Sequence, residues 1–192
     1  MESKFTKSLA NKGTENRGLA LLLTDPRFQA VDAPIKRRIL ELIGIEGAFG
    51  IQTFDAVMTG AQQNPITLQS IDDLIGDVTL IEMKTTRKPI KSATLHGFFF
   101  GATEREYAMA KALGDRYRFA FIVLNETNEY GRPFAVLLPL AEVERRTRAQ
   151  RIQYQVNFRS DTEPSEGDEL LVFGSSKHIP SEEPTLQSDL TQ

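Results

Sequence analysis

Two apolar stretches of strand length, separated by a helical one, limit the folds open to this chain. Residues 78–86 (VTLIEMKTT), as far as Met83, and residues 117–124 (YRFAFIVL) are mostly apolar, as strands covered on both faces are. Between them, Thr103 begins a segment with Glu106 three positions later and Gly114 at its end, which is the pattern of a capped helix. This succession predicts an α/β fold with a mixed β-sheet flanked by helices on both faces.

The other predicted elements are placed by hydrophobic periodicity and by glycine and proline residues. Helices are expected over residues 15–23, 35–43 and 141–150, and strands over residues 51–58, 68–75, 134–138 and 151–158. Gly76 and Asp77 form a turn pair, so residues 68–75 and 78–86 are expected to form a β-hairpin. In the second helix, Lys36 is expected to face solvent together with the two arginines that follow it.

Counting residues excludes several kinds of site. The chain has 192 residues and no cysteine, so it can form neither a disulfide nor a thiolate nucleophile nor a cysteine-based zinc site. Only two histidines are present, His96 and His178, which excludes a histidine-pair metalloprotease site. The sequence has no apolar run of eighteen residues and no secretory signal, so we expect a cytoplasmic protein without a membrane span.

Charge is distributed unevenly along the chain. The whole chain carries −3, but residues 160–192 hold eight acidic side chains and one lysine, which leaves +4 for residues 1–159. We therefore expect one folded domain over residues 1–159, with a loose polar start at residues 1–13, and an acidic, largely disordered tail over residues 160–192. A mildly basic body is compatible with binding to nucleic acid.

Two charged side chains interrupt the first of the apolar stretches. Because side chains alternate along a strand, Glu82 and Lys84 emerge on the same face of a sheet that should be covered. Charges in such a place are costly unless they are paired or bind a metal. The bare pattern is not specific, and the alternative interpretation is an edge strand with a solvated Glu82–Lys84 ion pair.

An acidic segment lies just before this strand. Asp72, Asp73 and Asp77 occur within SIDDLIGD, and the expected hairpin brings Asp73 alongside Glu82. Two carboxylates so placed repel each other unless one is protonated or a divalent cation lies between them. With Lys84 beside them, this set is suited to a Mg²⁺-activated water and to the charge of a phosphodiester under attack.

The segments around the charged pair resemble a known family. DDLIGDVTLIEMKTT and FFFGATEREYAMAKALGDRYRFAFIVLN, within residues 70–125, resemble the PD-(D/E)xK superfamily of restriction-endonuclease-like nucleases. The likeness is greatest to the branch of Mrr-like enzymes and NO VEIN C-terminal domains. The segment NKGTENRGLALLL also resembles that family's first helix, although Gly13 stands two positions before Glu15 instead of immediately before it. The resemblance implies a restriction-endonuclease-like fold.

Carried over by position, the resemblance assigns the metal-binding carboxylates to Asp73 and Glu82 and the catalytic lysine to Lys84. No proline precedes the aspartate, and Asp72 is the alternative to Asp73 as the ligand. Glu15 is a candidate supplementary ligand or, alternatively, an acid that favours the start of a helix. The implied cofactor is Mg²⁺, with Mn²⁺ as its substitute.

The resemblance implies a Mg²⁺-dependent endonuclease that hydrolyses phosphodiester bonds in double-stranded DNA, in a restriction or defence role and as a homodimer. Two alternatives stay open: a non-catalytic nucleic-acid-binding or assembly subunit of the same fold, and a nuclease directed at RNA or at junctions. The aromatic run at residues 98–100 is expected in the core, with base stacking as its alternative.

Candidate DNA contacts lie after the charged strand and in the last predicted helix: Arg87, Lys88, Lys91, Arg145 and Arg148. The arginines of the helix have a second interpretation, because they can pair with Glu142 and Glu144 on the same helix.

Overall fold

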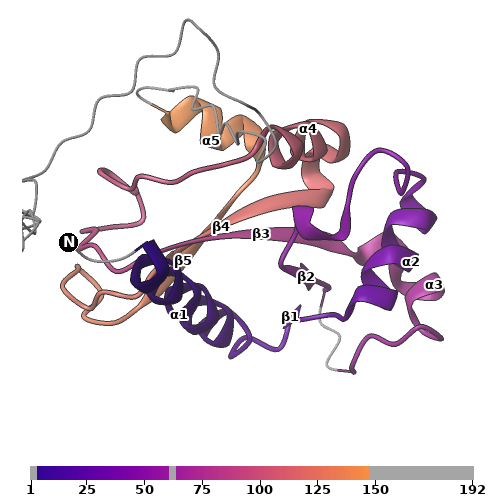
Figure 1. The fold of residues 1–192 in the computed structure, drawn as a ribbon, viewed down its shortest axis with the longest axis horizontal. Coiled ribbons are helices and arrows are strands. Elements are labelled where there is room, and N and C mark those ends of the chain that lie inside the picture. The colour runs from indigo at the N-terminus through magenta and orange to yellow at the C-terminus, as the bar shows by residue number, and fades with distance from the viewer. Residues whose placement is uncertain (1–3, 61–63, 148–192) are drawn as a thin grey trace, which may run out of the picture. The chain divides into compact units, whose positions relative to one another are not determined.

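A mixed five-stranded β-sheet lies at the centre of the fold, with helices on both of its faces (Figure 1). The structure is a computed structural model that describes residues 4–60 and 64–147. The strands follow one another across the sheet in chain order: β1 (Phe28–Gln29), β2 (Ala56–Met58), β3 (Thr79–Thr86), β4 (Tyr117–Val123) and β5 (Phe134–Leu138). β3 and β4 are parallel, and the other neighbouring pairs are antiparallel. The predicted α/β class and mixed sheet are confirmed.

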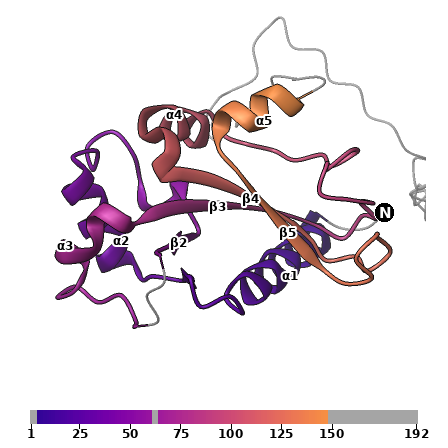
Figure 2. The ribbon, with the colours of Figure 1, turned by 180° about the vertical axis from the view of Figure 1, so that it is seen from behind.

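The helices form two layers. They are α1 (Lys4–Leu22), α2 (Ala33–Ile43), α3 (Ile71–Leu74), α4 (Glu104–Leu113) and α5 (Leu140–Arg146), with short 3₁₀ turns η1 (Ile51–Thr53), η2 (Ile75–Asp77) and η3 (Gly114–Arg116). In both views α1 lies along one face of the sheet, whereas α4 and α5 lie across the other (Figure 2). The prediction of helices on both faces is therefore confirmed.

Side chains of the sheet divide between two apolar clusters, one beneath each helical layer. Leu80 and Phe119 belong to the cluster shared with α2, α4 and α5, whereas Ile81 belongs to the cluster shared with α1. The parallel register pairs Glu82 with Phe119, so Glu82, and with it Lys84 two positions later, lies on the α4 face. The covered position predicted for these two charges is thus observed.

Local sequence explains where the helices of the charged face begin. In α2, the Asp32 carboxylate accepts a hydrogen bond from the N–H of Ile35, and Gly44 ends the helix with a φ of 79°. In α4, the Thr103 hydroxyl accepts from the N–H of Glu106 while the Glu106 carboxylate accepts from the N–H of Thr103. The predicted capping box is confirmed, and Oε2 of the same Glu106 carboxylate also contacts Lys84 of β3.

The predicted hairpin between residues 68–75 and 78–86 is wrong. Residues 71–74 form α3, and β3 instead takes β2 as its antiparallel neighbour. Aspartate and serine favour helix starts and turns over strands, because their short side chains bond to nearby backbone. Ile71 is buried and Leu74 half-buried, three positions apart, as on one side of a helical turn.

Three smaller differences concern element lengths. α1 begins at Lys4, so the predicted loose start is helical from that residue onward. The strand expected over residues 51–58 is divided into η1 and β2, and β1 was not predicted because two residues show no alternation. The predicted strand 134–138 and helix 35–43 are confirmed, the helix starting two residues early.

Some predictions lie outside the described residues: the strand over residues 151–158, the domain limit at residue 159, the acidic tail over residues 160–192, and Arg148. Within the described part of the chain, no helix combines the length and the apolar character needed to cross a bilayer.

Candidate carboxylate–lysine site

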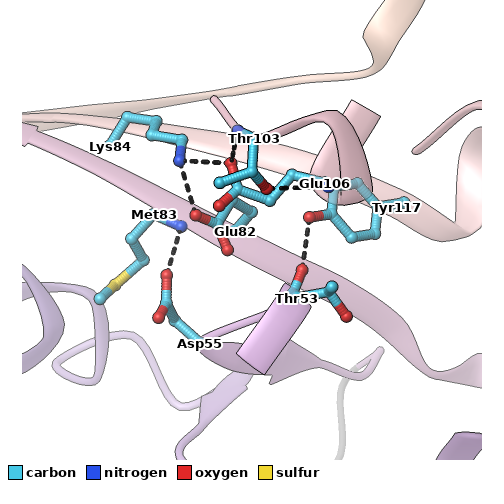
Figure 3. A network of polar contacts seen from close by, with 8 residues as sticks. All are labelled: Thr53, Asp55, Glu82, Met83, Lys84, Thr103, Glu106 and Tyr117. Atoms are coloured by element: carbon cyan, nitrogen blue, oxygen red, sulfur yellow. Dashed lines mark hydrogen bonds and ion pairs between the residues drawn. The ribbon is translucent and has the colours of Figure 1, made fainter. Parts of the chain in front are cut away.

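The two charges of β3 are buried and paired on the α4 face. The Lys84 ammonium donates to Glu82 Oε1 and to Glu106 Oε2, each at 2.7 Å (Figure 3). Glu82 is only 6% exposed, and its strand lies between β2 and β4. The alternative of a solvated pair on an edge strand is therefore wrong, although the ion pair itself is present.

Asp55 is an acid that adjoins β3 near Glu82. β2 and β3 pair Ala56 with Ile81, and the N–H of Asp55, the residue before β2, donates to the carbonyl oxygen of Ile81 at 2.8 Å, which places Asp55 next to the position of Glu82. Its Oδ2 accepts a hydrogen bond of 2.8 Å from the N–H of Met83 (Figure 3). The structure thus supplies a second carboxylate beside β3, from the residue that immediately precedes β2.

Asp73, the acid predicted for this place, lies elsewhere. It is exposed on α3, which is not part of the sheet, so the expectation that it stands alongside Glu82 on a neighbouring strand is wrong. Its alternative, Asp72, is also exposed on α3 and accepts a hydrogen bond of 2.9 Å from Nε of Arg38. Neither of the two aspartates adjoins β3, whereas Asp55 does.

Two side chains from separate elements hold the backbone just before Asp55. The Tyr117 hydroxyl donates to the carbonyl oxygen of Thr53 at 2.6 Å (Figure 3). The Lys36 ammonium donates to the carbonyl oxygen of Phe54 at 2.6 Å and lies 4.7 Å from the centre of that residue's ring. Asp55 therefore projects from a segment tied to both β4 and α2.

The inward direction of Lys36 corrects the prediction that it faces solvent. The residue lies beside Ile35 and four positions before Leu40, both of which are buried. Positions four apart share a side of a helix, so the spacing to Leu40 was the sign that Lys36 borders the core. Its pKa is lowered by burial, an effect that the nearby charges of Asp55 and Glu82 oppose.

Glu106 connects the helix cap to the charged pair. Its Oε2 accepts both the N–H of Thr103 at 3.1 Å and the ammonium of Lys84 at 2.7 Å. The cap could be predicted from sequence, because Thr103 and Glu106 have the required spacing. The contact with Lys84 could not, since it depends on how α4 docks on the sheet.

Burial and crowding of negative charge raise the pKa of Glu82 to about 8. Burial is the larger cause and the charge of Asp55 the next, while Lys84 acts in the opposite direction. Burial lowers the pKa of Lys84, but Glu82 and Glu106 more than offset it, so the pKa is raised and the amine stays charged. Below about pH 8 Glu82 therefore holds a proton, whereas Lys84 is charged.

The carboxylates fit a hard divalent cation held by two protein ligands. Among residues 4–60 and 64–147, no group of three or more acidic, histidine or cysteine side chains is placed to hold a metal ion. Asp55 Oδ1 and Glu82 Oε2 accept no hydrogen bond from any described residue. Mg²⁺ in proteins commonly takes one or two carboxylates and keeps several waters, which matches such a pair.

The remaining predicted residues are not gathered at this cluster. Glu15 is exposed on α1, the helix that packs on the opposite face of the sheet from Glu82. Exposed positions after β3 are occupied by Arg87, Lys88 and Lys91, as expected of DNA contacts.

Arg145 forms the ion pair within its own helix that was the alternative to a DNA contact. Its Nη2 lies 2.6 Å from Glu142 Oε1, and Arg146 shares the same carboxylate. Glu144 forms no such pair within the described part of α5.

No protein-family model matches the chain, and no curated protein or solved structure matches it either. Membership of the PD-(D/E)xK superfamily, a role in restriction and a homodimeric state stay predictions from the sequence. Asp55, Glu82, Lys84 and Glu106 are the charged side chains that the structure brings together beside β3.

Proposed function

We propose that this protein is a Mg²⁺-dependent endonuclease of the PD-(D/E)xK type that hydrolyses phosphodiester bonds in DNA. One observation carries the proposal. Asp55, immediately before β2, binds the N–H of Met83 and acts electrostatically on Glu82, and Lys84 lies two positions after Glu82 on the same face of β3. Two carboxylates and one amine in this arrangement are the groups that metal-assisted phosphodiester hydrolysis needs.

Asp55 and Glu82 are the residues that would hold the cation. When bound, the cation supplies an activated water and an electrostatic partner for the phosphate oxygens. Asp55 keeps one oxygen on the backbone of Met83, which orients its carboxylate toward β3. Glu82 would hold such a cation as the carboxylate, because the positive charge would offset the burial and the nearby charge of Asp55 that raise its pKa.

Lys84 is the residue that would donate a hydrogen bond to the phosphate. Its ammonium is held in place by two carboxylates, and it has three N–H donors in all. The third donor is available to a phosphate oxygen or to the attacking water while Glu106 keeps the amine positioned. Developing negative charge on the phosphate is thereby met by a fixed positive charge in a largely buried setting.

The two aspartates, Asp55 and Asp73, give a matched test of the proposal. Purified wild-type protein, Asp55→Asn, Glu82→Gln, Lys84→Ala and Asp73→Asn are incubated with plasmid, linear duplex and single-stranded DNA, with Mg²⁺, Mn²⁺ or EDTA. Calorimetric titration with Mn²⁺ measures cation binding. Asp55→Asn and Glu82→Gln should lose both cutting and Mn²⁺ binding, Lys84→Ala should lose cutting alone, and Asp73→Asn should retain both.

Loss of cutting in Asp73→Asn with retention in Asp55→Asn would overturn the site. DNA binding without cutting by the wild-type protein under every metal condition would instead favour the non-catalytic subunit. Cutting confined to RNA or to junction substrates would keep the chemistry and change the substrate.

A further inference from the structure

Phe99 presents an aromatic ring to solvent. It is 82% exposed, the highest value among the large apolar side chains with high exposure in the described part of the chain. An exposed phenylalanine ring forgoes the free energy of burial and is open to contact with a partner. The expectation that the run at residues 98–100 packs in the core therefore fails at its middle position.

The residues on either side of Phe99 are anchored. Phe98 and Phe100 both pack edge-on against Phe121, with ring centres 5.2 and 4.9 Å apart. Phe121 is the register partner of Lys84 in the parallel pair of β3 and β4, so both lie on the same face of the sheet. Phe99 therefore projects from a segment that packs on Phe121, the neighbour of Lys84 in the sheet.

The loop that carries Phe99 is held by bonds from two other elements. The N–H of Ala93 donates to the Tyr130 hydroxyl at 3.3 Å, and Arg146 Nη1 donates to the carbonyl oxygen of Ala93 at 3.1 Å. Leu95 adopts a φ of 60°, a left-handed conformation that costs a non-glycine residue about 1–2 kcal/mol. Such strain persists only where the surroundings enforce it, so the loop has a set shape.

Charge on the same loop is of one sign. Residues 87–103 contain Arg87, Lys88 and Lys91 and no acidic residue. All three cations are exposed. Proteins that bind single-stranded nucleic acid combine cations, which follow the phosphate backbone, with aromatic rings on which bases stack. In an intact duplex the faces of the bases are covered by their neighbours, so an isolated ring stacks on an unpaired base without the cost of unstacking a base step.

We propose that Phe99 is the stacking platform for an unpaired base, and that the DNA acted on at this site is single-stranded or locally unpaired next to the scissile phosphate. The inference rests on the proposed nuclease function, whose substrate class it narrows. Arg87, Lys88 and Lys91 guide the phosphate backbone along the loop, and Phe99 holds one base to one side of Lys84.

The chain has no tryptophan, so Phe99→Trp creates a fluorescent reporter at this position alone. The full-length variant is titrated in EDTA with a single-stranded oligodeoxynucleotide and with a duplex of the same sequence. Stacking should quench the tryptophan, at lower concentrations of the single strand than of the duplex. Leu68→Trp, at a position 49% exposed on the turn before α3, is the matched control and should not be quenched.

Affinity is measured separately with Phe99→Ala and Phe99→Tyr. A stacked base contributes about 1–3 kcal/mol, so the alanine variant should bind the single strand about 5- to 150-fold more weakly, and the tyrosine variant should bind like the wild type. Because the ring is exposed, thermal unfolding of Phe99→Ala should match the wild type, which separates lost stacking from misfolding.

The outcomes separate this inference from the proposed function. Equal quenching by duplex and single strand, or no quenching by either, overturns the inference. Quenching by phospholipid vesicles or by an added protein, without quenching by the single strand, also overturns it. Metal-dependent cutting that Phe99→Ala leaves unchanged also overturns it while the nuclease function stands. Selective quenching by the single strand, in a protein that never cuts, upholds the stacking site and removes the nuclease function.

Discussion

At the scale of single residues, the site shows how burial changes the pKa of a charged side chain. Glu82 and Asp55 are both acids in contact with β3, yet the covered position of Glu82 raises its pKa to about 8. Lys84 satisfies one oxygen of Glu82 and leaves the other without a hydrogen bond from the described residues. A bound cation would take up this second oxygen.

The raised pKa of Glu82 predicts how stability depends on pH. The carboxyl ionises near 4.5 in the unfolded chain and near 8 in the folded one, so between these values the folded state holds the extra proton. Its stabilising contribution is complete below about pH 4.5 and is lost as pH rises through about 8, at about 1.4 kcal/mol for each unit of difference.

Urea denaturation at a series of pH values from 5 to about 9 measures this slope. The free energy of unfolding should decline with pH in the wild type, and the Glu82 contribution should vanish in Glu82→Gln. An unchanged slope in the variant would show that another group is responsible.

At the scale of elements, the sequence was informative where the pattern of residues is local. The helix after Thr103 and strand β4 were predicted because a capping box and a continuous apolar run are each visible in about ten residues. Glu82 and Lys84 were placed on one covered face for the same reason, since alternation is a property of the strand itself.

Strand pairing was the step that the sequence could not supply. Residues 71–74 lie close to β3 in the chain, and a turn pair intervenes, so a hairpin was the expected connection. The true partner, β2, has three residues and begins just after Asp55, too short for alternation to mark it or to single out its acid. Asp55 was therefore missed, although it lies within the segment predicted to be a strand.

The contact between α1 and β3 depends on the absence of a side chain at Gly18. A Cβ there would collide with Thr85 Oγ1 and would lie 2.9 Å from Thr85 Cγ2. Gly18→Ala should therefore destabilise the protein by about 1–3 kcal/mol, because neither helix nor strand can easily give way. Gly13→Ala, in the same helix but 3.9 Å from its nearest neighbour atom, should be neutral or slightly stabilising.

A double variant tests whether Thr85 is the cause. Thr85→Ala removes the hydroxyl and methyl groups that collide, and the hydroxyl is buried without a partner among the described residues. Gly18→Ala combined with Thr85→Ala should recover most of the lost stability in urea denaturation. A double variant that loses as much stability as the two single variants together would show that the collision is not the source.

At the scale of the whole molecule, apolar packing and buried charge are divided between the two faces of the sheet. The α1 face is closed by apolar packing, whereas the α4 face holds the carboxylates, the lysine and the anchor of the aromatic loop. The basic balance of residues 1–159 adds a general attraction for polyanions, which should act on every sequence alike.

Salt dependence of DNA binding should distinguish free cations from paired ones. Lys88 is exposed and has no ion pair with a described residue, whereas Arg145 is already paired with Glu142. Lys88→Gln should reduce the slope of log affinity against log salt by about 0.7 on a single strand, and Arg145→Gln should reduce it by less. Fluorescence anisotropy with a labelled oligonucleotide, from about 50 to 200 mM salt, measures both slopes. Equal slopes in the two variants would contradict the distinction.

The shared oxygen of Glu106 has a consequence for how such a protein can change. One atom caps the start of α4 and also binds the amine of Lys84, so a substitution that reshapes the helix start also alters the position of that amine. A substitution of Glu106 therefore affects the helix cap and the contact with Lys84 together. If β3 were transferred to another protein without α4, it would keep Lys84 but lose the Glu106 carboxylate that positions the amine.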